Sequence, residues 1–177
     1  SFNKLIDTTI KGNERLKIDH SEKRFEYKHA LILEDGSLIS SNEIAPLFKI
    51  DFCSQLLWIN QEKQFHHSKM LDSDKNIWVG SKMYPYPKLF ETGKPLRFND
   101  DSITKVNQKG EILYIKSVSK ILIENGIFGQ ELFHLGNNPI HLNDIEPAFH
   151  DTQYWKKGDL FLSIRNLSAI IHYRPSN

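Results

Sequence analysis

Short apolar runs separated by polar turns dominate the chain, and this pattern predicts strands rather than helices. The clearest case is the pair 30–33 and 37–40, which flank Asp35-Gly36. Asp-Gly tolerates the positive φ angles of a two-residue hairpin turn, so a hairpin is expected here. The same pattern predicts further strands at 46–51, 55–60, 65–67, 77–79, 102–106, 112–115, 140–145, 160–165 and 169–173.

A histidine opens the first strand in each of three successive units. The three are His29, His67 and His141, spaced by 38 residues (29 to 67) and 74 residues (67 to 141). Units of about 40 residues with four short strands are typical of β-propeller blades. The sequence therefore predicts an all-β fold, with residues 1–177 forming a single β-propeller segment of about three blades. An open meander or a sandwich fits the strands equally well but does not explain the recurring histidine.

Two insertions interrupt the pattern, at 81–101 and 117–138. The first is rich in proline and aromatic residues, so a loop over one face of the sheets is expected rather than a central strand. The second begins with a short helix over 117–125, because a serine N-cap precedes spaced apolar positions and a glycine ends them. Helix is otherwise expected to be scarce.

Composition excludes several classes of function. The 23 Lys+Arg and 22 Asp+Glu residues give a net charge of +1, so neither nucleic acid binding nor docking on acidic membranes is supported. The longest apolar runs, 30–33 and 169–171, are far too short for a membrane span. Cys53 is the only cysteine, which excludes an internal disulfide and a cysteine-based zinc site, and it is expected to be an inert thiol.

Three kinds of side chain are candidates for chemistry. In a propeller the innermost strands line a central channel, so His29, His67 and His141 are expected to converge there. His66 and His67 are neighbours in a strand, and strand alternation sends them to opposite faces, so only one can point inward. Arg165 follows a strand and could offer its planar fork of donors to sulfate or phosphate. Structural histidines and a surface salt bridge of Arg165 remain the alternatives.

No metal or other cofactor is expected from the sequence. Segment 72–76 is similar to the start of a calcium loop, but Ile77 and Met83 replace the glycine and glutamate that such a loop needs, so a hairpin turn is predicted. Adjacent strand histidines such as His66 and His67 cannot easily share one ion. A glycine-rich phosphate loop and a Gly-x-Ser-x-Gly elbow are also absent from the sequence.

The order of several short motifs resembles the arylsulfotransferase family. The motifs are His66-His67 before a turn, Ile77-Trp78-Val79, His141-Leu142-Asn143-Asp144-Ile145, and Gly158 to Asn166 with Ser163-x-Arg165. The resemblance covers most of the chain from about residue 25 and is clearest over 140–173. It implies a six-bladed propeller that transfers a sulfuryl group between phenolic compounds through a sulfated histidine, without a nucleotide donor. It also implies a periplasmic or other extracytoplasmic location.

The resemblance also implies roles for individual residues. His67 or its neighbour His66, together with His141 and Arg165, would bind the sulfuryl oxygens or transfer protons, and Asn143 would orient the site. In the family the nucleophilic histidine comes from a blade after the Ser-x-Arg strand. The candidate site residues are therefore His29, His66, His67, His141, Asn143 and Arg165, with an aryl sulfate or phenolic small molecule as the partner.

The nucleophile remains unassigned in this sequence. His172 is the only histidine after Arg165, and its position matches the family poorly. The chain is expected to supply about half of a propeller, to be inactive alone, and to obtain the other blades from further sequence or a second chain. An alternative is a non-catalytic propeller that binds a small anion, an aromatic ligand or a partner protein. A third hypothesis, an accessory protein in glycan or phenol degradation, depends on the aromatic loop 81–101.

Overall fold

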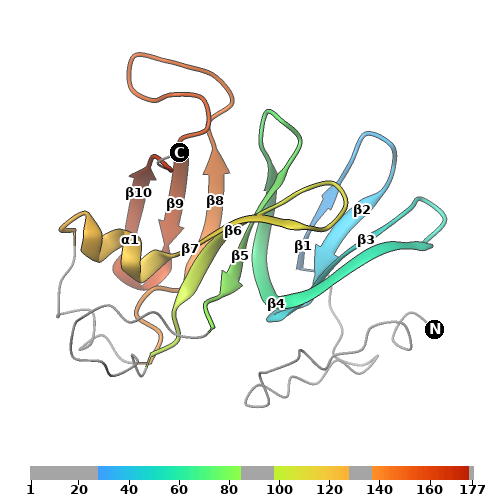
Figure 1. Cartoon of the computed structure of the whole chain (residues 1–177), viewed down its shortest axis with the longest axis horizontal. Helices are drawn as coiled ribbons and strands as arrows, with labels where there is room; N and C mark the ends of the chain where they lie inside the picture. Colours follow the sequence, from blue (N-terminus) through green and yellow to red (C-terminus); the bar gives the residue numbers. More distant parts are fainter. Residues whose placement is uncertain (1–27, 85–97, 128–136, 176–177) are drawn as a thin grey trace.

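The computed structural model describes residues 28–84, 98–127 and 137–175 (Figure 1). Within these ranges the chain forms one sheet of seven strands and one of three, and neighbouring strands pair antiparallel. The elements are β1 (Lys28–Ile32), β2 (Leu38–Ser41), β3 (Ala45–Ile50), β4 (Leu56–Leu71), β5 (Ile77–Lys82), β6 (Asp101–Val106), β7 (Ile112–Ser117), α1 (Val118–Glu124), β8 (Leu142–Pro147), β9 (Leu160–Ile164), a short 3₁₀ helix (Arg165–Leu167) and β10 (Ala169–Tyr173).

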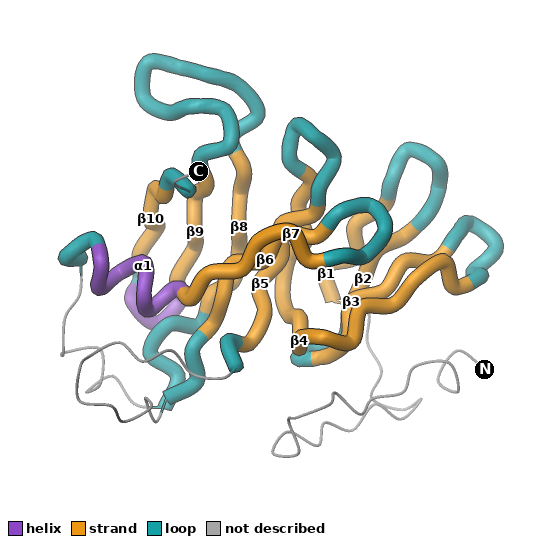
Figure 2. Tube along the Cα trace, in the orientation of Figure 1, coloured by secondary structure: helices purple, strands orange, loops and turns teal. Residues whose placement is uncertain are grey.

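Strand β4 joins two groups of strands. Its first part pairs with β3, as in Leu47 opposite Asn60, and its last part pairs with β5, as in Leu71 opposite Ile77. The prediction of separate strands at 55–60 and 65–67 was therefore wrong. No glycine or proline interrupts these 16 residues, so the strand continues while it bends and changes partner (Figure 2).

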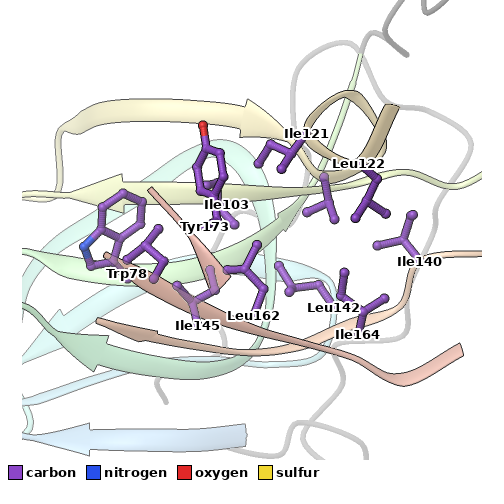
Figure 3. Close-up of a cluster of buried hydrophobic side chains, with 12 residues drawn as sticks. Trp78, Ile103, Ile121, Leu122, Ile140, Leu142, Ile145, Leu162, Ile164 and Tyr173 are labelled. Carbon is purple, nitrogen blue, oxygen red and sulfur yellow. The ribbon is translucent and has the colours of Figure 1, made fainter. Parts of the chain in front are cut away.

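The sheets pack face to face in a propeller-like arrangement, which confirms the predicted all-β, partial-propeller fold. One hydrophobic cluster lies between β2–β3 and the β4–β6 strands, and a larger one joins β5 and β6 to α1 and the β8–β10 sheet (Figure 3). Strand β4 also contacts β1 on one side and β8 on the other. The three strands that carry or follow the recurring histidines therefore lie side by side.

Four hairpin turns share one backbone conformation. In each, the first residue forms backbone hydrogen bonds with the fourth and the fifth, and the fourth residue has φ between 62° and 85°. The predicted turns at 72–76 and 107–110 are of this kind. The turn at Asp35-Gly36 is not the two-residue turn expected, because Gly36 alone adopts a positive φ there and the turn spans 33–37. The fourth residues are Gly36, Ser54, Lys75 and Gly110.

Helix α1 forms where the sequence predicts it. The Ser117 side chain caps the helix by accepting a hydrogen bond from the backbone N–H of Lys120 at 3.0 Å. Ile121 and Leu122 are fully buried against the β8–β10 sheet, which ties the helix to the core (Figure 3).

The first insertion is shorter than its predicted limits. Ser81 and Lys82 belong to β5, and Lys82 pairs with Asp101 at the start of β6, so the insertion is a connection between two paired strands. Residues 85–97 of this insertion and 128–136 of the second lie outside the described residues, and so does the middle of the predicted aromatic loop 81–101. Among the residues described, no helix is long and apolar enough to cross a membrane.

Candidate functional site

Three histidines occupy equivalent backbone positions at the inner strands. His29 lies in β1, His67 lies in β4, and His141 directly precedes β8. Their φ angles are 45°, 55° and 49°, a left-handed conformation that is uncommon for residues other than glycine. Each lies at or directly before an irregularity in strand pairing. Such bulges redirect a side chain out of the normal alternation, and here they do so in the same way three times.

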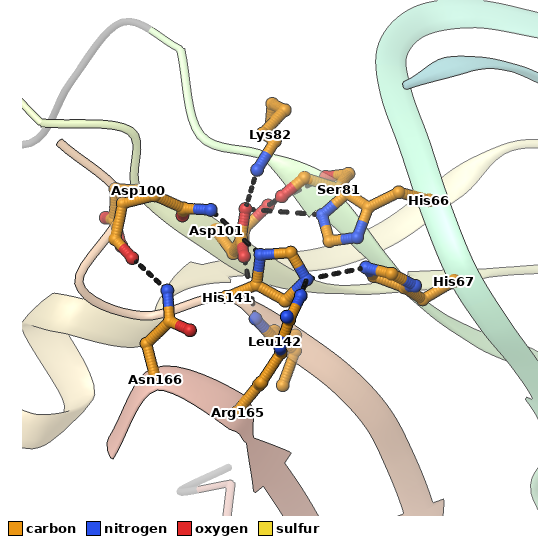
Figure 4. Close-up of polar contacts among 12 residues, drawn as sticks. His66, His67, Ser81, Lys82, Asp100, Asp101, His141, Leu142, Arg165 and Asn166 are labelled. Carbon is orange, nitrogen blue, oxygen red and sulfur yellow. Dashed lines mark hydrogen bonds and ion pairs between the residues drawn. The ribbon is translucent and has the colours of Figure 1, made fainter. Parts of the chain in front are cut away.

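The side chains of His67 and His141 meet in one cluster, together with Arg165 (Figure 4), and His29 lies beside His67. His67 Nε2 lies 3.2 Å from His141 Nε2, and the His29 and His67 rings are 6.2 Å apart between centroids. Arg165 Nη1 lies 3.5 Å from His141 Nε2, and the Arg165 backbone N–H donates to the His141 carbonyl at 3.0 Å. The convergence expected for equivalent positions around a channel is therefore present.

The two remaining candidates lie differently. His66 is buried, with Nε2 3.3 Å from Asp101 Oδ1, whereas the ring of His67 meets His141. The prediction that His66 and His67 point to opposite faces was wrong, because the positive φ of His67 breaks the strand alternation and the two rings touch edge to face with centroids 5.0 Å apart. Gly80 makes room for His66, since a Cβ there would lie 3.0 Å from His66 Cε1. Asn143 joins β4 through its backbone carbonyl, which accepts from Ser68 Oγ at 3.1 Å. Among the described residues, no side-chain hydrogen bond connects Asn143 to the cluster.

A buried carboxylate next to the cluster was not predicted. Asp101 is fully buried, and its oxygens accept from Lys82 Nζ at 2.6 Å and from the Leu142 backbone N–H at 2.8 Å (Figure 4). Burial acts to raise the pKa of Asp101, but His66 and Lys82 outweigh it and hold the pKa well below its usual range. Asp101 is therefore an anion, and no spacing in the sequence could have indicated partners on β4, β5 and β8.

Two further residues at the site were also missed. The Asn138 side-chain amide lies 2.8 Å from His141 Nδ1, which leaves Nε2 of that ring to face His67 and Arg165. Lys69 is buried, and its ammonium donates to the carbonyls of Lys28 and His67 at 2.9 and 2.7 Å. Burial lowers the pKa of Lys69 to about 7. Both residues fix the backbone or ring of a cluster histidine.

The His67 and His141 rings are neutral around pH 7. Burial lowers the pKa of His67 to about 4, and the neighbouring His66 and His141 contribute. Burial also lowers the pKa of His141, where Asp101 acts in the opposite direction and Arg165 adds to the lowering. Two neutral imidazoles in contact through Nε2 hold one proton between them, so one ring donates and the other accepts. An anion placed between the rings and Arg165 would favour uptake of a second proton.

Contacts of Arg165 and His172 show what each of these side chains binds. In the described part of the chain, Arg165 forms no ion pair with a carboxylate, so its guanidinium faces His141 instead. His172 binds Asp159 Oδ2 at 2.7 Å and stacks on Phe161, with ring centroids 5.0 Å apart. Across the described residues, no group of three or more His, Cys, Asp or Glu could hold a metal ion.

Comparison with known protein families identifies the chain as similar to one of them. The family model described as arylsulfotransferase (ASST) matches residues 29–177, a range that contains every candidate site residue. No curated protein matches the chain.

Proposed function

The chain belongs to the arylsulfotransferase family, and on this basis we propose that the cluster of His67, His141 and Arg165 binds the sulfuryl group of an aryl sulfate during its transfer to another phenol. The observation that carries the proposal is the contact between the two imidazole nitrogens, 3.2 Å apart, with the Arg165 guanidinium beside them. Donors from three separate segments of the chain converge there on one small volume.

The chemistry of sulfuryl transfer suits these donors. A nucleophilic histidine nitrogen forms a bond to sulfur while the bond from sulfur to the phenolic oxygen breaks, and the leaving phenolate takes up a proton. The acceptor phenol then loses its proton and takes the sulfuryl group from the histidine. Negative charge spreads over the sulfuryl oxygens in both steps, and fixed N–H donors stabilise it as it develops. In this proposal His67, His141 and Arg165 hold these oxygens, and the nucleophile is left unassigned.

The proton shared by His67 and His141 gives the binding step a pH dependence. Both rings are neutral around pH 7, because burial lowers the pKa of each. A bound oxyanion stabilises the pair once a second proton has been added between the rings and the anion, and therefore raises the pKa of the pair. Sulfate binding is expected to strengthen as the pH falls, since the second proton then costs less free energy to add.

Direct binding of inorganic sulfate tests the proposal. The 177-residue chain is titrated with sodium sulfate while the imidazole resonances are followed by NMR. We expect His67→Ala and His141→Ala to weaken binding at least about tenfold, because each removes a charge-assisted hydrogen bond. The matched control is His172→Ala, a partly exposed histidine that binds Asp159. Equal sulfate affinity in the wild type and both cluster variants would overturn the proposal.

Reaction with 4-nitrophenyl sulfate then separates transfer from simple binding. Release of 4-nitrophenol together with a protein mass increase of one SO₃ group would support a covalent sulfated intermediate. Sulfate binding without transfer would support the alternative of a non-catalytic anion-binding propeller. The observation that favours this alternative is that no nucleophilic histidine is assigned in the chain.

A further inference from the structure

We propose that Asp101 is a positioning residue of the cluster, a buried carboxylate that holds the side chain of His66 beside His67 and the backbone of Leu142 beside His141, and supplies the negative charge that balances the pair. This proposal rests on the proposed function, because it concerns the same oxyanion site.

The geometry places Asp101 behind both cluster histidines. Its Oδ2 accepts from the Leu142 N–H at 2.8 Å, and Leu142 directly follows His141. Its Oδ1 lies 3.3 Å from Nε2 of His66, which directly precedes His67. One carboxylate therefore contacts the chain neighbour of each histidine, from its own position at the start of β6.

Holding these neighbours matters because the two histidines have a strained backbone. His67 and His141 have φ angles of 55° and 49°, which side chains with a Cβ adopt only when the surroundings impose them. A buried charge-assisted hydrogen bond is a strong contact of this kind. Loss of the bond to Leu142 would let the backbone relax and turn the His141 ring away from His67.

The charge of Asp101 acts on the same pair. Among the groups that face the two rings, Asp101 raises the pKa of both, whereas the neighbouring histidines and cations lower the pKa of one or both. Removing the Asp101 charge should therefore lower the pKa of the pair, so that proton uptake on sulfate binding needs a lower pH. The groups that act against Asp101 are His29 on β1, His66 on β4, Lys82 on β5 and Arg165 after β9.

Asp101→Asn tests the proposal in the full chain, because asparagine keeps the size and can still accept from the Leu142 N–H. The readouts are the pKa values of His67 and His141 by NMR and the affinity for inorganic sulfate as a function of pH. We expect both pKa values to fall and the pH at which sulfate binding is half-maximal to move down by roughly one unit. Unchanged pKa values and an unchanged sulfate pH profile would overturn the proposal.

Asp100→Asn is the matched control. Asp100 is the chain neighbour and is equally buried, but its carboxylate accepts from Ser117 Oγ and Ser119 Oγ at 2.5 and 2.7 Å, beside α1. This variant is expected to alter stability and leave the histidine pKa values and the sulfate pH profile unchanged. The same shift in both variants would show that any buried charge near β6 has this effect and would overturn the proposal.

Lys82→Gln is a second variant, which keeps the proposal testable if Asp101→Asn does not fold. Its expected shift in the histidine pKa has the opposite sign. Lys82 lowers the pKa of His141, so Lys82→Gln should raise it and move sulfate binding to higher pH. A downward shift in that variant would contradict the charge balance assigned to Asp101. The histidine pKa values are measured without sulfate, so failure of the wild type to bind sulfate would overturn the proposed function and leave the positioning test intact.

Discussion

The contact between His67 and His141 combines strained backbone with unusual protonation. A left-handed φ at a residue other than glycine costs on the order of 1–3 kcal/mol, so these positions persist because neighbouring contacts hold them. The Arg165 backbone N–H, donating to the His141 carbonyl, is one such contact. The same bond brings the Arg165 guanidinium to the ring, so backbone position and side-chain chemistry are linked at this residue.

Replacing Arg165 by lysine should weaken sulfate binding about tenfold, because an ammonium cannot reproduce the planar fork of a guanidinium even though the charge is kept. Isothermal titration with sodium sulfate at fixed pH measures the effect. Arg174→Lys is the control, since the Arg174 guanidinium forks onto Asp159 at 2.6 and 2.7 Å. The control should lose stability and keep its sulfate affinity. Unchanged sulfate affinity in Arg165→Lys would show that Arg165 does not hold the anion.

The hairpin turns illustrate how single elements set the geometry around the site. Strands β1 and β4 both lead from a cluster histidine into a turn of the shared type. Side-chain oxygens of Asp51, Asp72 and Asn107 accept backbone N–H groups within three of these turns, which fixes their shape. The fourth position of each turn needs a positive φ, and the chain fills it with glycine in only two of the four cases.

Ser54→Gly should stabilise the protein by about 0.5 kcal/mol, because glycine adopts the φ of 64° found at this position without the steric cost that serine bears. The entropy that glycine gains in the unfolded chain offsets part of the benefit. Urea unfolding followed by circular dichroism measures the change.

The opposite substitution in a turn of the same type serves as control. Gly36→Ser should destabilise the protein, because Gly36 has φ 76° and a Cβ there would meet the Cβ of Phe52 at 3.4 Å. A loss of stability in Ser54→Gly would show that a serine side-chain contact, rather than backbone strain, dominates at that turn.

The β8–β10 sheet presents an edge that bears on the molecule as a whole. In the part of the chain that the structure describes, β10 pairs only with β9. Ile170 on β10 is 76% exposed. An edge strand with an exposed apolar side chain is a template for pairing with another chain.

We therefore expect the 177-residue chain to self-associate, and Ile170→Lys to reduce the association, because a charge on an edge strand opposes strand addition. Light scattering over a range of protein concentrations measures it. Tyr154→Lys is the control, since Tyr154 is 73% exposed but lies in a loop. A wild-type protein that stays monomeric at all concentrations would contradict the expectation.

Much of the fold could be read from local pattern. Alternating apolar positions and turn residues located nearly all strands, and Ser117 with Gly126 marked the helix. The spacing of His29, His67 and His141 indicated equivalent positions, which the shared φ angles now describe in detail. These features were accessible because strand alternation, helix capping and turn conformation depend on residues close together in the chain.

The chemistry of the site was not accessible in this way. The bond from Leu142 to Asp101 joins residues 41 apart, and the contact between His67 and His141 joins residues 74 apart. A hydrophobic pattern indicates which face of a strand is buried, but not which residue of another sheet meets it. Asp101, Asn138 and Lys69 therefore carried no signal in the sequence, and the neutral state of the histidines follows from burial and neighbouring charges that exist only once the sheets have packed.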